Sequence, residues 1–456
     1  MLLMMGAIFL LCIGLVWCLG LKAVPVLVLY AFTQNFFLPL LFTRGLLSAE
    51  ACKALIYGKE VLCLVLTIYA VKTMYTDRVR LRFSLIVLAI FTLWCVFTGL
   101  MTLGGHGDLQ SAGRWIRDSC APLEFVLIGA ALAKKPSIRS FPRMYVFTLG
   151  VLAIVAVCLI GSWGEMVWAR YANVATFDIA VKGESSSEQD LTTGTNGSGN
   201  MSERSAFFGA LAKYRAMGTF GEPISMAFNM AFGLLVAMFV VRKSSRWFLL
   251  LLALALLLSF TRSAWIFFTL ASLFVLFKRR KVIRLAAFLA VIAGSLTLVA
   301  PLREFVTYSV TNLQGTGEKH SAGIKSFYSG VWARQESVWW GGSIVGSAVD
   351  EWGQQSLLIG DVNATRMPES GYGFLVMKNG IPAYILFLIF CVAGLVDLQQ
   401  SPDKNLGAVM QGVILAVLVV MHTSYYVFAF SASIVIWIML GATIAGYDPT
   451  SAFNKQ

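Results

Sequence analysis

Long apolar stretches follow one another along almost the whole of this 456-residue chain. Most contain about 16 to 25 residues, the length that an α-helix needs to cross roughly 30 Å of bilayer hydrocarbon. They cover residues 3–20, 23–42, 55–75, 83–103, 112–133, 144–162, 220–241, 246–260, 263–278, 282–300, 371–396, 404–421 and 424–446. We therefore predict an all-α polytopic membrane protein with about 12–13 transmembrane helices.

The composition agrees with this prediction. Hydrophobic residues make up 58% of the chain and charged residues 13%, which is more apolar surface than one soluble core can bury. The first stretch has no basic segment in front of it, so it is predicted to be the first helix and not a cleaved signal peptide.

Basic residues are concentrated in four short connections between apolar stretches. The four groups are Lys72, Arg78, Arg80 and Arg82; Lys134, Lys135, Arg139 and Arg143; Arg242, Lys243 and Arg246; and Lys278 to Lys281 with Arg284. An excess of Lys and Arg in every second short loop marks the cytoplasmic side of a membrane protein. The net charge of +13 therefore indicates topology, and no nucleic-acid partner is expected, because these residues do not form a soluble basic face with stacking aromatics.

This topology divides the chain into five parts. Residues 1–162 are predicted to be N-terminal transmembrane helices, and residues 163–218 an outer loop with a flexible Ser/Gly-rich segment at 183–203. Residues 219–300 are predicted to be further transmembrane helices. Residues 301–370 form a large outer loop between the tenth and eleventh helices, and residues 371–456 form the C-terminal helices.

Metal and nucleotide chemistry have no support in the sequence. The histidines His106, His320 and His422 are far apart, and no HExxH or CxxC spacing occurs. A phosphate-binding loop of the GxxxxGK type is also missing from the sequence. We expect neither a metal nor another cofactor.

Several arginines lie at the predicted outer ends of helices. They are Arg114, Arg117, Arg215 and Arg262. An arginine at mid-bilayer costs about 2.5–3.5 kcal/mol on the most lenient scale, so such residues face a cavity, a partner or the interface. Each alone is equally well explained by snorkelling or ion pairing, for example Arg117 with Asp118 or Glu124. Together they predict an anion site, which suits a lipid diphosphate because guanidinium binds phosphate oxygens in pairs.

Glu369 stands where the large outer loop re-enters the membrane. A carboxylate there is placed to take a proton from a sugar hydroxyl as a general base. As an isolated feature, Glu369 is better explained as a helix-start acid favoured by the helix dipole. Its position beside the outer loop and the arginines is what favours the catalytic interpretation.

Three short motifs follow one another in this part of the chain. An arginine, a glycine and a proline at the start of a membrane helix occur as Arg215, Gly218 and Pro223, and a Ser-x-x-Arg turn occurs as Ser259 to Arg262. An acid, a tyrosine and Gly-Ile-Pro occur as Glu369, Tyr372 and Gly380-Ile381-Pro382. In this order and spacing, residues 205–400 resemble the O-antigen ligase and O-unit polymerase superfamily of bacterial envelope glycosyltransferases.

The resemblance implies a membrane-embedded glycosyltransferase that uses an undecaprenyl diphosphate-linked oligosaccharide as donor. It implies that Arg215 and Arg262 bind the diphosphate and that Glu369 activates the acceptor hydroxyl. Substrate-binding roles are predicted for Arg114, Arg117, Arg334, Arg366 and Tyr372. The expected location is the bacterial inner membrane, with the active site and the large loop facing the periplasm, and the expected partners are membrane lipid and a chain-length regulator protein.

Three functions stay open at this point. A repeat-unit polymerase is favoured over an O-antigen ligase, because ligases of the superfamily typically carry a histidine at the last motif position and the chain has none between His320 and His422. The non-enzyme alternative is a flippase or exporter of lipid-linked glycan. A flippase needs a continuous polar path through its helices, whereas the polar residues of this chain are concentrated at the outer helix ends.

Overall fold

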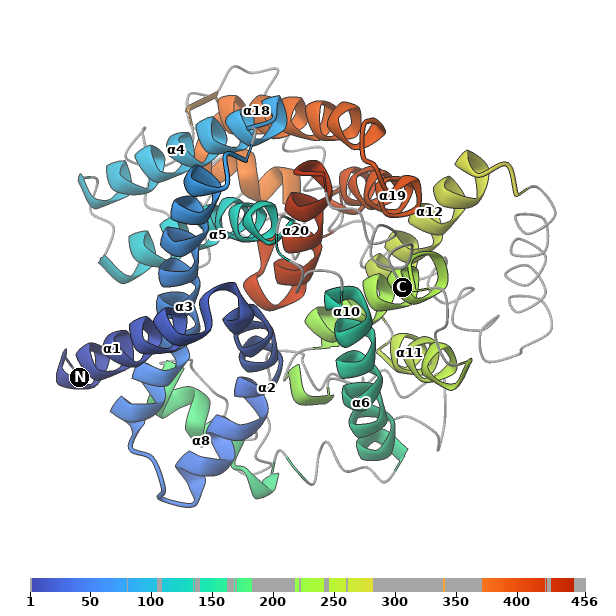
Figure 1. Ribbon diagram of the computed structural model, residues 1–456. Coiled ribbons are helices and arrows are strands. Elements are labelled where there is room, and N and C mark those ends of the chain that lie inside the picture. The colour runs from blue at the N-terminus through green and yellow to red at the C-terminus, as the bar shows by residue number, and fades with distance from the viewer. Residues whose placement is uncertain are drawn as a thin grey trace, which may run out of the picture.

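The computed structural model shows a bundle of helices, and no strand occurs among the residues that it describes (Figure 1). Those residues are 2–79, 81–104, 109–133, 135, 140–161, 168, 170–182, 218–220, 223–241, 246–259, 261–281, 339–340, 371–422, 424 and 428–446. The first half contains α1 (Leu2–Leu19), η1 (Gly20–Ala23), α2 (Val24–Thr43), α3 (Ala49–Thr76), α4 (Phe83–Gly104), α5 (Leu109–Leu132), α6 (Phe141–Gly161), α8 (Val174–Phe177) and η3 (Asp178–Lys182). The second half contains η4 (Gly218–Phe220), α10 (Pro223–Phe239), α11 (Arg246–Leu258), α12 (Arg262–Lys278), α18 (Gly371–Gln399), α19 (Lys404–Val420) and α20 (Phe430–Ile444).

The helices coincide with the predicted apolar stretches. Every predicted stretch except 282–300, which lies outside the described residues, overlaps one of these helices. Five helical segments are long and apolar enough to cross a membrane by length and composition, namely Met4–Thr43, Ala49–Thr76, Phe83–Met101, Phe141–Cys158 and Lys378–Gln399. The described part of the chain therefore has the architecture of an α-helical membrane protein.

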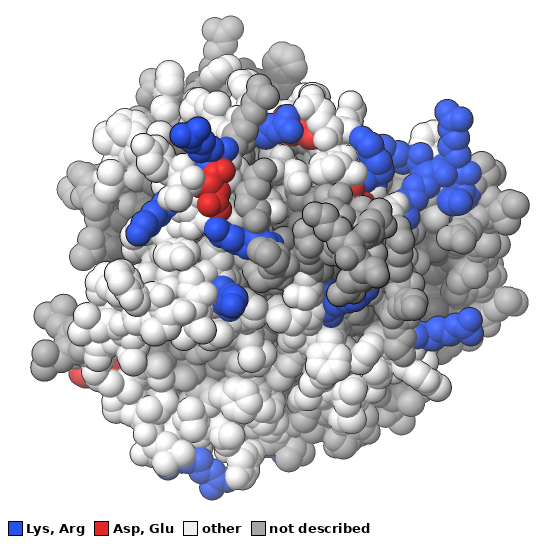
Figure 2. All heavy atoms as spheres, in the orientation of Figure 1, with Lys and Arg blue, Asp and Glu red and all other residues white. Residues whose placement is uncertain are grey.

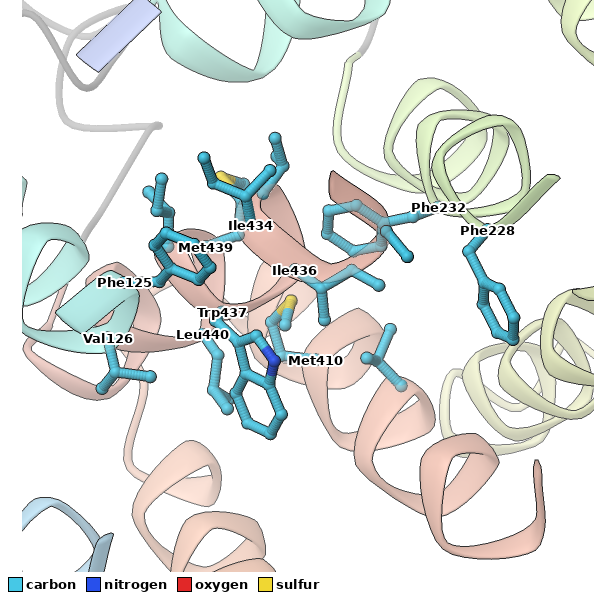
Figure 3. Close-up of a cluster of buried hydrophobic side chains, with 14 of the residues drawn as sticks. Phe125, Val126, Phe228, Phe232, Met410, Ile434, Ile436, Trp437, Met439 and Leu440 are labelled. Carbon is cyan, nitrogen blue, oxygen red and sulfur yellow. The ribbon is translucent and has the colours of Figure 1, made fainter. Parts of the chain in front are cut away.

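Helix α20 lies at the centre of the bundle. Figure 1 shows it with α5 on one side and α10 and α19 on the other, and every residue from Ala432 to Ile444 is buried. A helix that is apolar on all sides is stable only where protein or lipid surrounds it completely. In Figure 3, side chains of α5, α10 and α19 converge on Ile436 and Trp437 of α20. The middle of the described bundle is thus filled with side chains.

Glycines allow α5 and α20 to approach backbone to backbone. A Cβ atom added to Gly129 would collide with the carbonyl oxygen of Ile438, and one added to Gly441 would collide with the carbonyl oxygen of Val126. Small residues at such crossings are how membrane helices gain close van der Waals contact. The α5–α20 contact accordingly depends on the missing side chains of these two glycines.

Polar contacts tie together the helix ends that carry the basic residues. They join Lys135 Nζ to Asp77 Oδ2 at 2.8 Å, Ser84 Oγ to Asp397 Oδ2 at 2.6 Å, Arg82 Nη1 to Gln400 Oε1 at 2.7 Å, and Arg279 Nη2 to the carbonyl oxygens of Phe239 and Asn405 at 3.3 Å. The final residues of α3, α5, α10, α12 and α18 therefore lie on the same side as the first residues of α4 and α19. We call this side the basic end; in Figure 2 the visible Lys and Arg side chains lie mainly in the upper half of the molecule.

Helix α18 differs from the single helix predicted for residues 371–396. Gly380 has φ 75° and ψ 176°, which is outside the helical region and readily adopted only by glycine. Pro382 follows and has no N–H to donate to the carbonyl of Lys378. The helix is consequently divided into a short arm (residues 371–379) and a long arm (residues 381–399).

Replacing Gly129 or Gly441 with alanine should destabilise the protein by about 1–3 kcal/mol, because overpacking forces the two backbones apart. The matched control is Gly14→Ala in α1, where an added Cβ would meet nothing within 4 Å. The measurement is the unfolding temperature in detergent, followed by tryptophan fluorescence. Equal unfolding temperatures for Gly129→Ala and Gly14→Ala would contradict the close contact.

Candidate functional site

Arg262 follows a tight turn between α11 and α12. The Ser259 hydroxyl donates to the carbonyl of Leu256 at 2.6 Å and accepts from the Thr261 N–H at 3.3 Å, and Trp265 Nε1 donates to the same Leu256 carbonyl at 3.0 Å. Ser259 and Thr261 are buried. Hydroxyl groups of this kind satisfy backbone groups that a turn leaves without helical partners. The Ser-x-x-Arg motif therefore forms a turn that is held by hydrogen bonds and that fixes the first residue of α12.

This arginine lies far from the basic end. Helix α12 ends at Lys278, which contacts Gln411 of α19, and its 17 residues span roughly 25 Å. Near its start, Phe267 packs edge to face on Phe228 of α10 with ring centroids 5.5 Å apart. Arg262 is half-buried at the end of the bundle opposite the basic end, as the charge pattern predicts.

Tyr372 is held by the end of α19. Its hydroxyl donates to the carbonyl of Leu418 at 2.7 Å, and its N–H donates to the carbonyl of Met421 at 3.3 Å. Its buried ring lies edge to face with His422, at a centroid distance of 4.8 Å. These contacts use the hydroxyl proton of Tyr372 within the protein. Its predicted role in substrate binding stays a prediction.

Arg117 is paired with two carboxylates. Its Nε and Nη2 lie 2.8 Å from Asp118 Oδ1, and its Nη1 lies 3.2 Å from Glu60 Oε1 on α3. The pair with Asp118 is one of the two that the sequence suggested. The other, with Glu124, is not formed: Glu124 Oε2 accepts from the Cys63 thiol at 3.1 Å. Since Asp118 and Glu60 compensate the guanidinium charge, the geometry favours a structural role for Arg117, and its predicted substrate contact stays untested.

The remaining predicted site residues are not described at side-chain level. Arg114 belongs to α5, but its side chain lies outside the described residues, as do Arg215, Arg334, Arg366 and Glu369 altogether. Two of them adjoin described elements in the sequence: η4 begins shortly after Arg215, and α18 begins shortly after Glu369. Among the described residues, no group of three or more His, Cys, Asp or Glu side chains is arranged to hold a metal ion.

Sequence reasoning missed a polar cluster at the break in α18. Asn379 is buried, its carbonyl accepts from Trp94 Nε1 at 2.7 Å, and its side-chain oxygen accepts from Thr98 Oγ1 at 2.6 Å. Lys378 beside it is also buried. The signal available in the sequence was Lys378-Asn379 next to Gly380-Ile381-Pro382 inside an apolar stretch, because polar residues at that depth need partners.

Arg117→Met should lower the free energy of unfolding by about 1–3 kcal/mol, because it leaves Glu60 and Asp118 without their cation. The side chain of Glu60 is only 18% exposed. Adding Glu60→Gln to Arg117→Met should recover part of this loss by removing one of the stranded charges. Thermal unfolding in detergent measures both effects.

The control for this prediction is Lys135→Met. Lys135 pairs with the single carboxylate of Asp77 and is 40% exposed, so its loss should cost about 1 kcal/mol or less. A loss for Arg117→Met no larger than that of Lys135→Met would show that the three-residue cluster contributes nothing beyond an ordinary surface pair.

The described side chains thus give two well-defined polar features, the Arg262 turn and the anchored break in α18. Comparisons of the chain with protein-family models, with curated proteins and with solved structures find no match.

Proposed function

We propose that the chain is a polymerase that joins lipid-diphosphate-linked oligosaccharide repeat units at the periplasmic face of the bacterial inner membrane. The observation that carries this proposal is the position of Arg262. Its permanently charged side chain is half-buried. It follows the hydrogen-bonded turn and lies at the end of the bundle opposite the basic end. An arginine so placed is suited to a diphosphate group.

The distribution of charge supports the orientation. Cytoplasmic loops of membrane proteins carry the excess of Lys and Arg, so the basic end is the cytoplasmic side. Arg262 then faces the periplasm, the side on which the lipid-linked donor is presented. The start of α10 and the short arm of α18 lie on that side too, because the end of α10 belongs to the basic end and Tyr372 contacts the end of α19.

Chain connectivity supports the grouping of the catalytic residues. Glu369 precedes Gly371 by two residues and Arg215 precedes Gly218 by three, and an extended chain covers at most about 3.6 Å per residue. In the sequence, both residues thus shortly precede elements that begin at the end where Arg262 lies. This is the condition that a site built from Arg215, Arg262 and Glu369 has to meet.

In the proposed reaction, a sugar hydroxyl of one lipid-linked unit attacks the anomeric carbon of another. The new glycosidic C–O bond forms as the C–O bond to the diphosphate breaks, with inversion at the anomeric carbon. Glu369 takes the hydroxyl proton, and undecaprenyl diphosphate leaves with the bonding electron pair. Arg215 and Arg262 stabilise the charge that develops on the departing diphosphate, which is the kind of fixed electrostatic contact that dominates much enzyme catalysis.

The packed centre of the bundle favours chemistry at one end over movement of glycan through the middle. The axis of the described bundle is occupied by α20, whose residues from Ala432 to Ile444 are all buried. A polar headgroup crossing along that axis would have to displace close side-chain packing (Figure 3). The proposed reaction requires no such path, because donor and acceptor both enter from the outer side.

Arg262→Ala should abolish polymer while the lipid-linked repeat unit accumulates. Arg262→Lys should retain part of the activity, since it keeps the charge but loses the paired donors of guanidinium. The measurement is the chain-length distribution of polymer and the amount of extractable lipid-linked unit in a deletion strain that expresses each variant at equal membrane levels.

The matched control is Lys281→Ala, an exposed residue just beyond the opposite end of the same helix, which should leave polymer unchanged. Wild-type chain length in Arg262→Ala would remove this arginine from the site. Free, unattached polymer in the deletion strain would instead indicate a ligase, and movement of lipid-linked glycan without lengthening would indicate a flippase.

A further inference from the structure

The short arm of α18 is hydrogen-bonded to neighbouring helices at both of its ends. At one end, the Asn379 carbonyl accepts from Trp94 Nε1 and the Asn379 side-chain oxygen accepts from Thr98 Oγ1, both from α4. At the other end, Tyr372 bonds to the carbonyls of Leu418 and Met421 at the end of α19. The short arm therefore bridges two helices that belong to different parts of the chain.

The short arm also does not continue the axis of the long arm. Gln411 Nε2 of α19 donates to the Leu395 carbonyl in the long arm at 2.8 Å, and Leu418 of α19 contacts Tyr372 in the short arm. Along an unbroken α18, Tyr372 and Leu395 would be separated by roughly 34 Å, whereas Gln411 and Leu418 in α19 are separated by roughly 10 Å. A straight α18 packed along α19 cannot meet both contacts. The chain turns at Gly380, so that the short arm folds back toward α19.

The α4 contacts stabilise this turn chemically. The break leaves carbonyl groups near Gly380 without their helical donors, and a carbonyl buried without a partner is destabilising. Trp94 supplies the donor for the Asn379 carbonyl, and Thr98 supplies one for the Asn379 side chain. Thr98 and Asn379 are 0% and 2% exposed, so water cannot replace either bond. Without α4, this conformation of the break would lose two of its partners.

Glu369, the general base of the proposed function, lies just before the short arm in the sequence. We propose that Thr98 and Trp94 are positioning residues: by holding Asn379 they fix the short arm, which closely follows Glu369 in the sequence, and so support its action as the general base. This inference rests on the proposed function. It adds α4, which carries none of the motif residues, to the parts of the protein that determine catalytic geometry.

The decisive variant is Thr98→Val, which keeps the shape of the side chain and removes its hydroxyl. We expect kcat to fall about 10- to 100-fold, because misplacing a reacting group by about 1 Å costs on the order of 100-fold. KM for the lipid-linked unit should change less than about twofold, since its diphosphate is bound by Arg215 and Arg262 in the proposed site. Thr98→Ser, which restores the hydroxyl, should recover most of kcat.

The assay uses the purified chain in proteoliposomes, with the lipid-linked repeat unit extracted from the deletion strain as donor and acceptor. Hydrogen exchange of peptides that cover residues 371–379 is measured on the same samples. In Thr98→Val these amides should exchange faster than in the wild type, and in Thr98→Ser they should not. The control is Thr67→Val, which removes a hydroxyl whose bonds go to Cys63 of its own helix, and which should change neither quantity.

These readouts separate the two proposals. A wild-type chain that does not lengthen the glycan overturns the proposed function, while the exchange data still decide whether α4 holds the short arm. An active wild type with unchanged kcat in Thr98→Val overturns the positioning role and leaves the polymerase intact. If Thr98→Val does not accumulate, Trp94→Phe removes the other bond and carries the same expectations, and unchanged kcat there overturns the inference equally.

Discussion

The fold depends on the contact between α5 and α20. Helices surrounded by lipid gain little from hydrophobic burial against one another, so they associate through close van der Waals packing and through small residues that let backbones meet. Gly129 and Gly441 provide this approach at the centre of the bundle. The other faces of α20 contact α10 and α19. Helix α10 packs against α12, which begins at the Arg262 turn, and the end of α19 binds Tyr372 of α18. The placement of the outer-end residues therefore follows from a contact in the core.

The positions of the helices were predictable from the sequence because the apolar stretches must match a solvent of fixed thickness. The side on which Arg262 lies was predictable too, because the basic loops alternate along the chain. The pairing of side chains was not. Arg117 bonds to Glu60 as well as to its neighbour Asp118, and Glu60 belongs to another helix, so only the packing of α3 on α5 brings the two together.

The break in α18 shows a second limit of prediction from the sequence. The sequence indicated Gly380 and Pro382 as a motif, but a glycine and a proline do not specify the direction in which a chain turns. That direction depends on donors from α4, and Trp94 is indistinguishable in the sequence from an aromatic residue that faces lipid. Of the candidate site, the sequence indicated Ser259 to Arg262 and Tyr372 as motif residues, and their roles stay predictions. Arg215, Arg334, Arg366 and Glu369 lie outside the described residues and stay predictions.

Two ion pairs connect α3 with α5 and the turn that follows it. They are Glu60 with Arg117 and Asp77 with Lys135. The two pairs are roughly 26 Å apart along α3, close to the thickness of bilayer hydrocarbon. Both helices run in the same direction between the two ion pairs. A shift of one helix by a single turn relative to the other would therefore break both pairs. The two ion pairs thus favour a single register of α3 against α5.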